Sequence, residues 1–111
     1  MTTDQSQFVS TRNKGYQMTF QNGITISVQF GTGNYCDRRN SAYDRLTDDT
    51  ASAIVESKSA EIAIWDKNGT WFDFGHDKVK GWVSADEVAK WMILCASSTS
   101  IEDLQITASQ L

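Results

Sequence analysis

Two stretches near the beginning of the chain alternate apolar and polar side chains with a period of two, which is typical of half-buried strands. Their apolar positions are Tyr16, Met18, Phe20, Ile24, Ile26, Val28 and Phe30. A three-residue loop with Gly23 in the left-handed conformation pairs Phe20 with Ile24, Met18 with Ile26 and Tyr16 with Val28, all on one face. A two-residue turn would pair the apolar residues of one strand with the polar residues of the other. We therefore predict an antiparallel hairpin with the three-residue loop.

The same turn sequence recurs at Lys67-Asn68-Gly69, after Ile62 and Ile64 and before Phe72 and Phe74. A three-residue loop here pairs Ile64 with Phe72 and Ile62 with Phe74. It also pairs Trp65 with Trp71 on the opposite face of the sheet. Val79 to Val83 is a candidate fifth strand. The two hairpins together predict an antiparallel sheet of four to five strands.

A helix is predicted directly after this last strand. Ser84 and Glu87 have the spacing of a capping box, in which the serine side chain accepts a hydrogen bond from the third helical amide. The apolar positions that follow have helical spacing and are Val88, Trp91, Met92 and Cys95. The helix should end near Ser97. The predicted fold class is α+β, with the antiparallel sheet carrying one C-terminal helix packed on one face.

We predict a single domain over residues 14–97, between a flexible N-terminal tail at 1–13 and a C-terminal tail at 98–111. The alternative for the C-terminal tail is a short extra element at Ile101, Leu104 and Ile106. Residues 31–58 form a long loop with little periodicity. A loop of this length in a small domain is usually functional or disordered.

Charge and composition restrict the classes of function. The 111 residues include ten basic and fourteen acidic side chains, a formal net charge of −4. This balance argues against broad nucleic-acid binding, which needs clustered Lys and Arg. No apolar run approaches the ~18 residues of a membrane helix, and the N-terminus lacks the pattern of a signal peptide. We therefore expect a cytoplasmic protein whose Cys36 and Cys95 are reduced thiols.

The long loop contains the densest cluster of side chains suited to ligand binding. We predict ligand-binding roles for Asn34, Tyr35, Arg38 and Arg39, because two arginines can grip phosphate or carboxylate and a tyrosine ring can stack on a base. The alternative is a structured loop in which Tyr35 and Cys36 are buried and the arginines pair with Asp37, Asp44 or Asp48. Both alternatives stay open at the level of sequence.

The other chemistry-bearing residues indicate neither catalysis nor metal binding. A catalytic role for Cys36 would need a base, and the only histidine, His76 in Gly75-His76-Asp77, is far from Cys36 in the sequence. Cys36, Cys95 and His76 do not have the spacing of zinc ligands. We therefore predict no catalytic residue, no metal site and no cofactor.

Tryptophans are the candidates for a protein interface. In the predicted register, Trp65 and Trp71 form a pair on the face away from the helix, and Trp82 adds to one face or the other. Exposed aromatic patches mark interfaces, although the long loop or a tail could cover this one. We predict a homodimer through the face of Trp65 and Trp71, with the Arg38–Arg39 loop at its rim.

Three segments resemble small uncharacterised proteins of tailed bacteriophages. They are 22–36 (NGITISVQFGTGNYC), 60–69 (AEIAIWDKNG) and 79–88 (VKGWVSADEV), and the resemblance spans roughly residues 14–96. The resemblance carries no known activity or site residue. It implies an accessory protein expressed in the cytosol of a bacterial host, a setting in which such proteins often bind a host defence or metabolic component.

Three hypotheses about function follow. The leading one is a non-catalytic phage accessory protein that binds a host factor and so counteracts a bacterial defence. The alternative is an oligomeric sponge that sequesters a small nucleotide-type signal. The second alternative is a small enzyme that uses the 31–58 loop.

Overall fold

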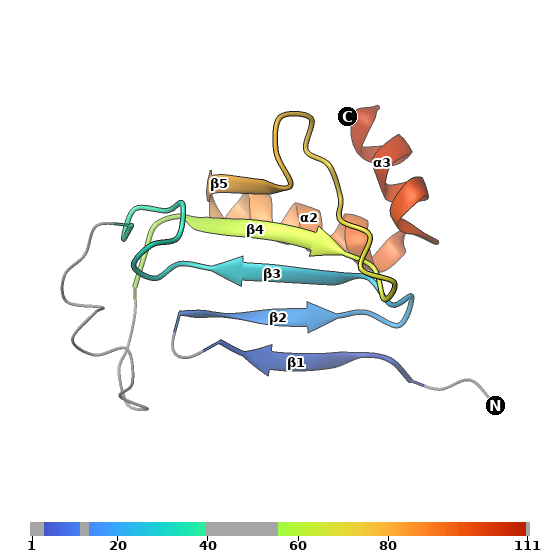
Figure 1. Cartoon of the computed structure of the whole chain (residues 1–111), viewed down its shortest axis with the longest axis horizontal. Coiled ribbons are helices and arrows are strands. Elements are labelled where there is room, and N and C mark those ends of the chain that lie inside the picture. Colours follow the sequence, from blue (N-terminus) through green and yellow to red (C-terminus); the bar gives the residue numbers. More distant parts are fainter. Residues whose placement is uncertain (1–3, 12–13, 40–55, 111) are drawn as a thin grey trace.

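The computed structural model describes residues 4–11, 14–39 and 56–110 (Figure 1). These form a five-stranded antiparallel sheet in which the strands are neighbours in chain order, followed by two helices. The elements are β1 (Gln7–Ser10), β2 (Gly15–Thr19), β3 (Thr25–Gln29), β4 (Ala60–Trp65), β5 (Val79–Val83), α2 (Ala85–Ser97) and α3 (Ile101–Ser109). The predicted α+β class is confirmed, but the prediction of one C-terminal helix was wrong, because the described residues form two, α2 and α3.

The first hairpin has the predicted register. Met18 lies opposite Ile26 and Tyr16 lies opposite Val28. The Phe20 N–H donates to the Ile24 carbonyl at 2.9 Å, which closes a three-residue loop. Gly23 has a φ of +86°, the left-handed conformation that favours glycine. The alternation of apolar residues on one face therefore predicts the correct loop length.

The strand β1 lies within the segment that we predicted to be a flexible tail. It pairs with β2 over its whole length, from Gln7 opposite Thr19 to Ser10 opposite Tyr16. Four residues are too few for a period of two to stand out from chance. The backbone hydrogen bonds that β2 offers along its edge hold this segment in the sheet.

The second hairpin has the predicted turn, but only part of the predicted strand pairing forms. Trp65 and Trp71 form a bridge, the Phe72 N–H donates to the Ile64 carbonyl at 2.8 Å, and Gly69 has a φ of +82°. The predicted pairing of Ile62 with Phe74 was wrong, because Ile62 pairs with Lys80 of β5.

The reason lies in an aromatic cluster beside α2. Trp91 of α2 makes edge-to-face contacts with Phe72 and Phe74, with ring centroids 5.3 and 5.2 Å apart. Such contacts stabilise aromatic pairs beyond the area that they bury. The chain therefore leaves the edge of β4 after Phe72 and follows the helix, and β5 completes the sheet.

Both helices begin with a serine cap. The Ser84 hydroxyl accepts a hydrogen bond from the Glu87 amide at 3.2 Å, as the capping box predicts, and α2 ends at Ser97. At the start of α3, the Ser100 hydroxyl accepts from the Asp103 amide at 3.0 Å. Ile101 and Leu104 of α3 are buried in the same core as Ile26, Ile62 and Cys95.

Replacing Ser84 with Ala should lower the free energy of unfolding by about 1 kcal/mol, because the Glu87 amide then loses its acceptor. Urea denaturation monitored by tryptophan fluorescence measures the change. Ser84→Asp is the matched control, because Asp also caps helices and should retain wild-type stability. Equal stability of the wild type and Ser84→Ala would contradict the role of this cap.

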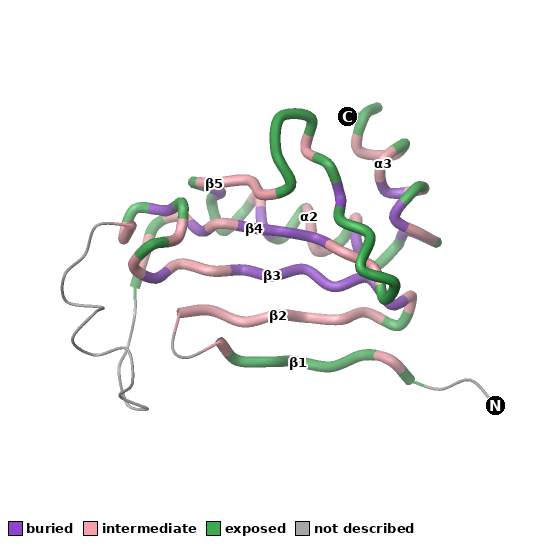
Figure 2. Tube along the Cα trace, viewed as in Figure 1, coloured by how far each residue is buried: buried purple, intermediate pink, exposed green. Residues whose placement is uncertain are grey.

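The helices cover the sheet unevenly. In Figure 1, α2 lies behind the part of the sheet that holds β4 and β5, and neither of the described helices lies behind β1. Burial follows the same order in Figure 2: β3 and β4 are mostly buried, β2 is intermediate and β1 is exposed. The core therefore sits between α2, α3 and one half of the sheet.

Candidate binding site around Trp82

An irregularity in β5 places Trp82 at the surface. Ala60 of β4 pairs with Val83, whereas Ile62 pairs with Lys80, so β5 holds one extra residue in a β-bulge at Gly81 and Trp82. Trp82 has a φ of +51°, and it is the only non-glycine residue of the described chain with positive φ. A bulky residue in this conformation is strained by about 1–3 kcal/mol. Its side chain is nevertheless 57% exposed.

Two residues of the 31–39 segment complete an aromatic and cationic patch with Trp82. The Tyr35 ring stacks on the Trp82 ring, with centroids 5.8 Å apart and planes inclined by 30°. The Arg39 guanidinium lies 4.4 Å from the centroid of the Tyr35 ring, in cation–π contact. We call Tyr35, Arg39 and Trp82 the Trp82 patch.

Backbone hydrogen bonds fix the patch to the sheet. The Trp82 N–H donates to the Tyr35 carbonyl at 2.8 Å, and the Tyr35 N–H donates to the Glu61 carboxylate at 3.1 Å. The Asp37 N–H donates to the Ser59 hydroxyl at 3.0 Å. These bonds connect the segment to β5, to β4 and to the residues just before β4. The two aromatic rings are therefore carried on a rigid support.

Gly81 permits this close approach. A Cβ atom at position 81 would lie 2.7 Å from the Cβ of Tyr35 and 3.1 Å from its carbonyl oxygen. Any larger residue would push the 31–39 segment away from β5. A glycine within a strand signals a bulge or a close backbone contact, and this signal could have located the site from sequence.

A shallow hollow of about 310 Å³ adjoins the patch. Its lining residues come from the patch, from β5 and from the turn before it, and they are Tyr35, His76, Asp77, Val79, Lys80, Gly81 and Trp82. Lys80 forms an ion pair with Glu87 of α2 at 3.7 Å, and both side chains are partly exposed. The hollow thus combines aromatic walls with titratable groups of both signs.

The four predicted ligand-binding residues divide into two pairs. Tyr35 and Arg39 belong to the patch. The Asn34 side chain instead accepts a hydrogen bond from the Gly31 amide at 2.9 Å and shapes the turn after β3. Arg38 donates to the Glu56 carbonyl at 3.0 Å and fastens the segment to residue 56. The predicted aspartate partners Asp44 and Asp48 lie outside the described residues.

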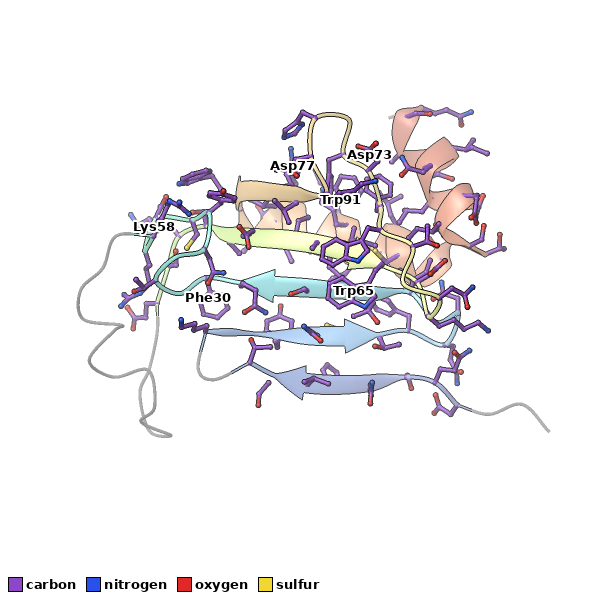
Figure 3. The ribbon with its side chains drawn as sticks, viewed as in Figure 1. Phe30, Lys58, Trp65, Asp73, Asp77 and Trp91 are labelled. Carbon is purple, nitrogen blue, oxygen red and sulfur yellow. The ribbon has the colours of Figure 1, made fainter. Side chains whose placement is uncertain are left out.

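The three predicted interface tryptophans do not form one surface. The rings of Trp65 and Trp71 are in tilted contact, with centroids 5.0 Å apart, and Trp65 lies at the end of β4 where the chain leaves the sheet (Figure 3). Trp82 lies beside Val83, which pairs with Ala60 at the other end of β4. Trp71 is 42% exposed. The alternation along Val79–Val83 assigns Trp82 to neither face, because the bulge interrupts the alternation.

The two thiols are enclosed. Cys36 is buried, and its Sγ atom lies 3.7 Å from the Gly31 carbonyl oxygen. Cys95 is buried in the core, and burial raises the pKa of its thiol to about 12. Cys95 therefore remains a protonated, unreactive thiol at neutral pH. Within residues 4–11, 14–39 and 56–110, no three Cys, His, Asp or Glu residues are grouped as metal ligands.

A second hollow, of about 480 Å³, lies between α2 and the middle of the sheet. Tyr16, Val28, Phe30, Val88 and Met92 give it mainly apolar walls, and burial raises the pKa of Tyr16. Figure 3 shows Phe30 and Lys58, another lining residue, near one end of the sheet. Polar residues 56–59 also line this hollow, and they directly follow residues 40–55, which are not described.

Comparison with known proteins provides no assignment. No protein-family model matches the chain, and no match is found among the curated proteins or the solved structures. Neither described helix is long and apolar enough to cross a membrane. The function must therefore be argued from the Trp82 patch itself.

Proposed function

We propose that this chain is a non-catalytic binding protein, and that it acts as a phage accessory protein that binds a host protein through the Trp82 patch. The observation that carries the proposal is the strained and exposed Trp82, stacked on Tyr35. Trp, Tyr and Arg are the residues most enriched at the energetic centres of protein interfaces. The patch brings one of each together.

The support of the patch favours tight recognition. A side chain that is already held in its bound orientation loses less conformational entropy when a partner binds. The hydrogen bonds from Trp82 to Tyr35 and from Tyr35 to Glu61 provide such preorganisation. Strained backbone persists only where the surroundings hold it, and it is concentrated at functional sites.

A small nucleotide-type ligand is the second candidate, and the hollow beside Trp82 is the observation that favours it. The indole could stack on a base, and Lys80 could approach a phosphate. Lys80 is already paired with Glu87, and Arg39 donates to the Gly33 carbonyl at 3.0 Å. A phosphate would have to compete with these bonds, so we place the protein partner first.

The test compares two variants that each lack one exposed tryptophan. Trp82→Gly removes the indole and accepts positive φ without strain, so the bulge and the fold remain. Trp71→Ala is the control at the other end of β4. We expect the wild type and Trp71→Ala to bind one host protein with equal affinity. Trp82→Gly should bind it at least about 30-fold more weakly, which corresponds to about 2 kcal/mol.

Isothermal titration with the purified partner measures these affinities, and melting curves show that each variant is folded. Unchanged affinity of Trp82→Gly would contradict the proposed contact surface. Loss of affinity in Trp71→Ala alone would instead favour the face of Trp65 and Trp71. A thermal shift with cyclic dinucleotides or ADP-ribose derivatives, absent in Trp82→Gly, would favour the second candidate, provided that the ligand is released intact.

A further inference from the structure

The two edges of the sheet differ in how well they are protected. At the β5 edge, the bulge interrupts the strand and the Trp82 N–H is already bonded to Tyr35. The other edge, β1, has the sequence Gln-Phe-Val-Ser, with no charge, no proline and no bulge. Proteins usually block an open edge with such features, because it offers unpaired backbone groups to another strand.

The outer side of β1 carries backbone donors and acceptors at alternate residues. The Thr11 N–H donates to the Gly15 carbonyl at 3.1 Å, so residues 11, 9 and 7 direct their backbone groups toward β2. By alternation, Phe8 and Ser10 direct their N–H and C=O groups toward the open edge. The next outward amide, that of Ser6, is already bonded to the Asp4 carboxylate at 2.9 Å. Among the described residues no strand pairs with this side of β1, so Phe8 and Ser10 form the centre of an open pairing edge.

An apolar row across the sheet ends at this edge. Ile64, Ile26, Met18 and Phe8 lie opposite one another on β4, β3, β2 and β1, on the face that carries the helices. The two isoleucines are fully buried, whereas Phe8 is 78% exposed. Exposure of a large aromatic ring at the end of a buried row is unfavourable in water. The row would be complete if apolar side chains continued it beyond Phe8.

We propose that β1 is the site of a symmetric dimer, in which it pairs antiparallel with β1 of a second copy so that the two Phe8 residues lie opposite each other. A two-fold axis perpendicular to the sheet produces this arrangement and keeps the helices of both copies on the same face. The row then runs from Ile64 of one copy through both Phe8 rings to Ile64 of the other. Phe8 is a hydrogen-bonded position on the open edge, as this register requires.

A second copy is the occupant that these observations favour over an unrelated strand. Opposite residues of an antiparallel pair point to the same face of the sheet. Two copies of β1 therefore place their Phe8 side chains on the same face only in registers that pair even-numbered residues with even-numbered ones, such as Phe8 with Phe8. Phe8 opposite Phe8 meets this condition and pairs two aromatic rings. The strand also contributes no like charges to the contact, although each copy carries a net charge of −4.

This interface differs from the predicted dimer through Trp65 and Trp71. On that face, the row from β1 to β4 is Gln7, Thr19, Thr25 and Trp65, and the hydroxyls of Thr19 and Thr25 are bonded at 2.7 Å. Polar groups that already bond to one another gain little by leaving water. The β1 edge combines unpaired backbone groups with an exposed aromatic ring. The inference does not depend on the function of the Trp82 patch.

Sedimentation velocity over a range of concentrations tests the proposal with three variants. Phe8→Lys places two ammonium groups opposite each other and removes the aromatic contact, so the dissociation constant should rise at least about tenfold. Ile93→Lys introduces the same charge at an exposed position of α2, which is 67% accessible. Trp71→Glu tests the alternative face. Both controls should retain the wild-type dissociation constant.

Amide hydrogen exchange supplies a residue-specific readout. As the concentration rises through the dissociation constant, exchange at Phe8 and Ser10 should slow, whereas exchange at Val9, which is bonded to β2, should change little. Four results would each overturn the proposal: a monomeric wild type at millimolar concentration, an unchanged dimer in Phe8→Lys, a dimer whose Phe8 amide exchanges as fast as in the monomer, or dissociation in Trp71→Glu alone.

Discussion

Replacing Asn22 with Asp is expected to lower the free energy of unfolding by about 2–3 kcal/mol at neutral pH. The Asn22 amide nitrogen donates to the Cys95 carbonyl at 2.7 Å and to the Ser98 carbonyl at 2.6 Å, so the first hairpin turn caps the end of α2. A carboxylate cannot donate these bonds. It would also face carbonyl oxygens at the negative end of the helix dipole.

The loss of stability caused by Asn22→Asp should become smaller as the pH falls. The carboxylate form of the introduced group is disfavoured in the folded state, so its folded pKa is raised above the ordinary value of about 4. The loss of stability is therefore complete above the raised pKa and shrinks as the pH falls through it, because a protonated carboxyl donates one bond. Urea denaturation at several pH values measures this dependence.

Asn68 provides the matched control for this prediction. It occupies the same place in the second turn, its side chain is exposed, and the hydrogen bond that it makes runs from its backbone amide to the Asp66 carboxylate. Asn68→Asp should change the stability by less than about 0.5 kcal/mol. Equal effects of the two substitutions would mean that Asn22 acts only within its own turn.

Replacing Leu104 with Ala should lower the free energy of unfolding by about 3 kcal/mol, within the usual range of 2–5 kcal/mol for a buried leucine. The Leu104 side chain is 0% exposed and packs in the core with residues of β3, β4 and α2. The truncation removes apolar contacts and leaves a cavity between α3 and the rest of the domain. Thermal or urea unfolding, followed by near-ultraviolet circular dichroism, measures the loss.

Ile106 is the control on the same helix, because its side chain is 60% exposed. Ile106→Ala should change the stability by less than about 0.5 kcal/mol. If Leu104→Ala were as mild as Ile106→Ala, α3 would contribute little to the core. A large difference between the two variants would show that the domain extends through α3.

Local patterns predicted the parts of the fold that depend on neighbouring residues. The alternation around Gln21-Asn22-Gly23 predicted the loop length and the pairing of Met18 with Ile26, because a shift by one residue would reverse every side chain. Ser84 and Glu87 predicted the start of α2. Within the candidate site, the residue types alone led to predicted binding roles for Tyr35 and Arg39, because an aromatic ring can stack on a partner and a guanidinium group can bind an anion.

Other features depend on contacts between residues that are far apart in the sequence. The partner of Ile62 is Lys80 instead of Phe74, because Phe74 gains more by packing against Trp91 than by extending the hairpin. The strand β1 exists because β2 offers an edge, and its four residues carry little pattern of their own. No local pattern could weigh these competing contacts against each other.

The candidate site shows most clearly the difference between what local sequence patterns predict and what long-range contacts decide. The sequence by itself predicted ligand-binding roles for Tyr35 and Arg39, alongside Asn34 and Arg38, and separately an interface role for Trp82, alongside Trp65 and Trp71. Only the tertiary structure brought Tyr35, Arg39 and Trp82 together, because a bulge at Gly81 and Trp82 lets the 31–39 segment approach β5 closely. A β-bulge leaves one extra residue unpaired with the neighbouring strand, and here the Trp82 N–H bonds instead to the Tyr35 carbonyl, a contact between residues far apart in the sequence that no local pattern specifies.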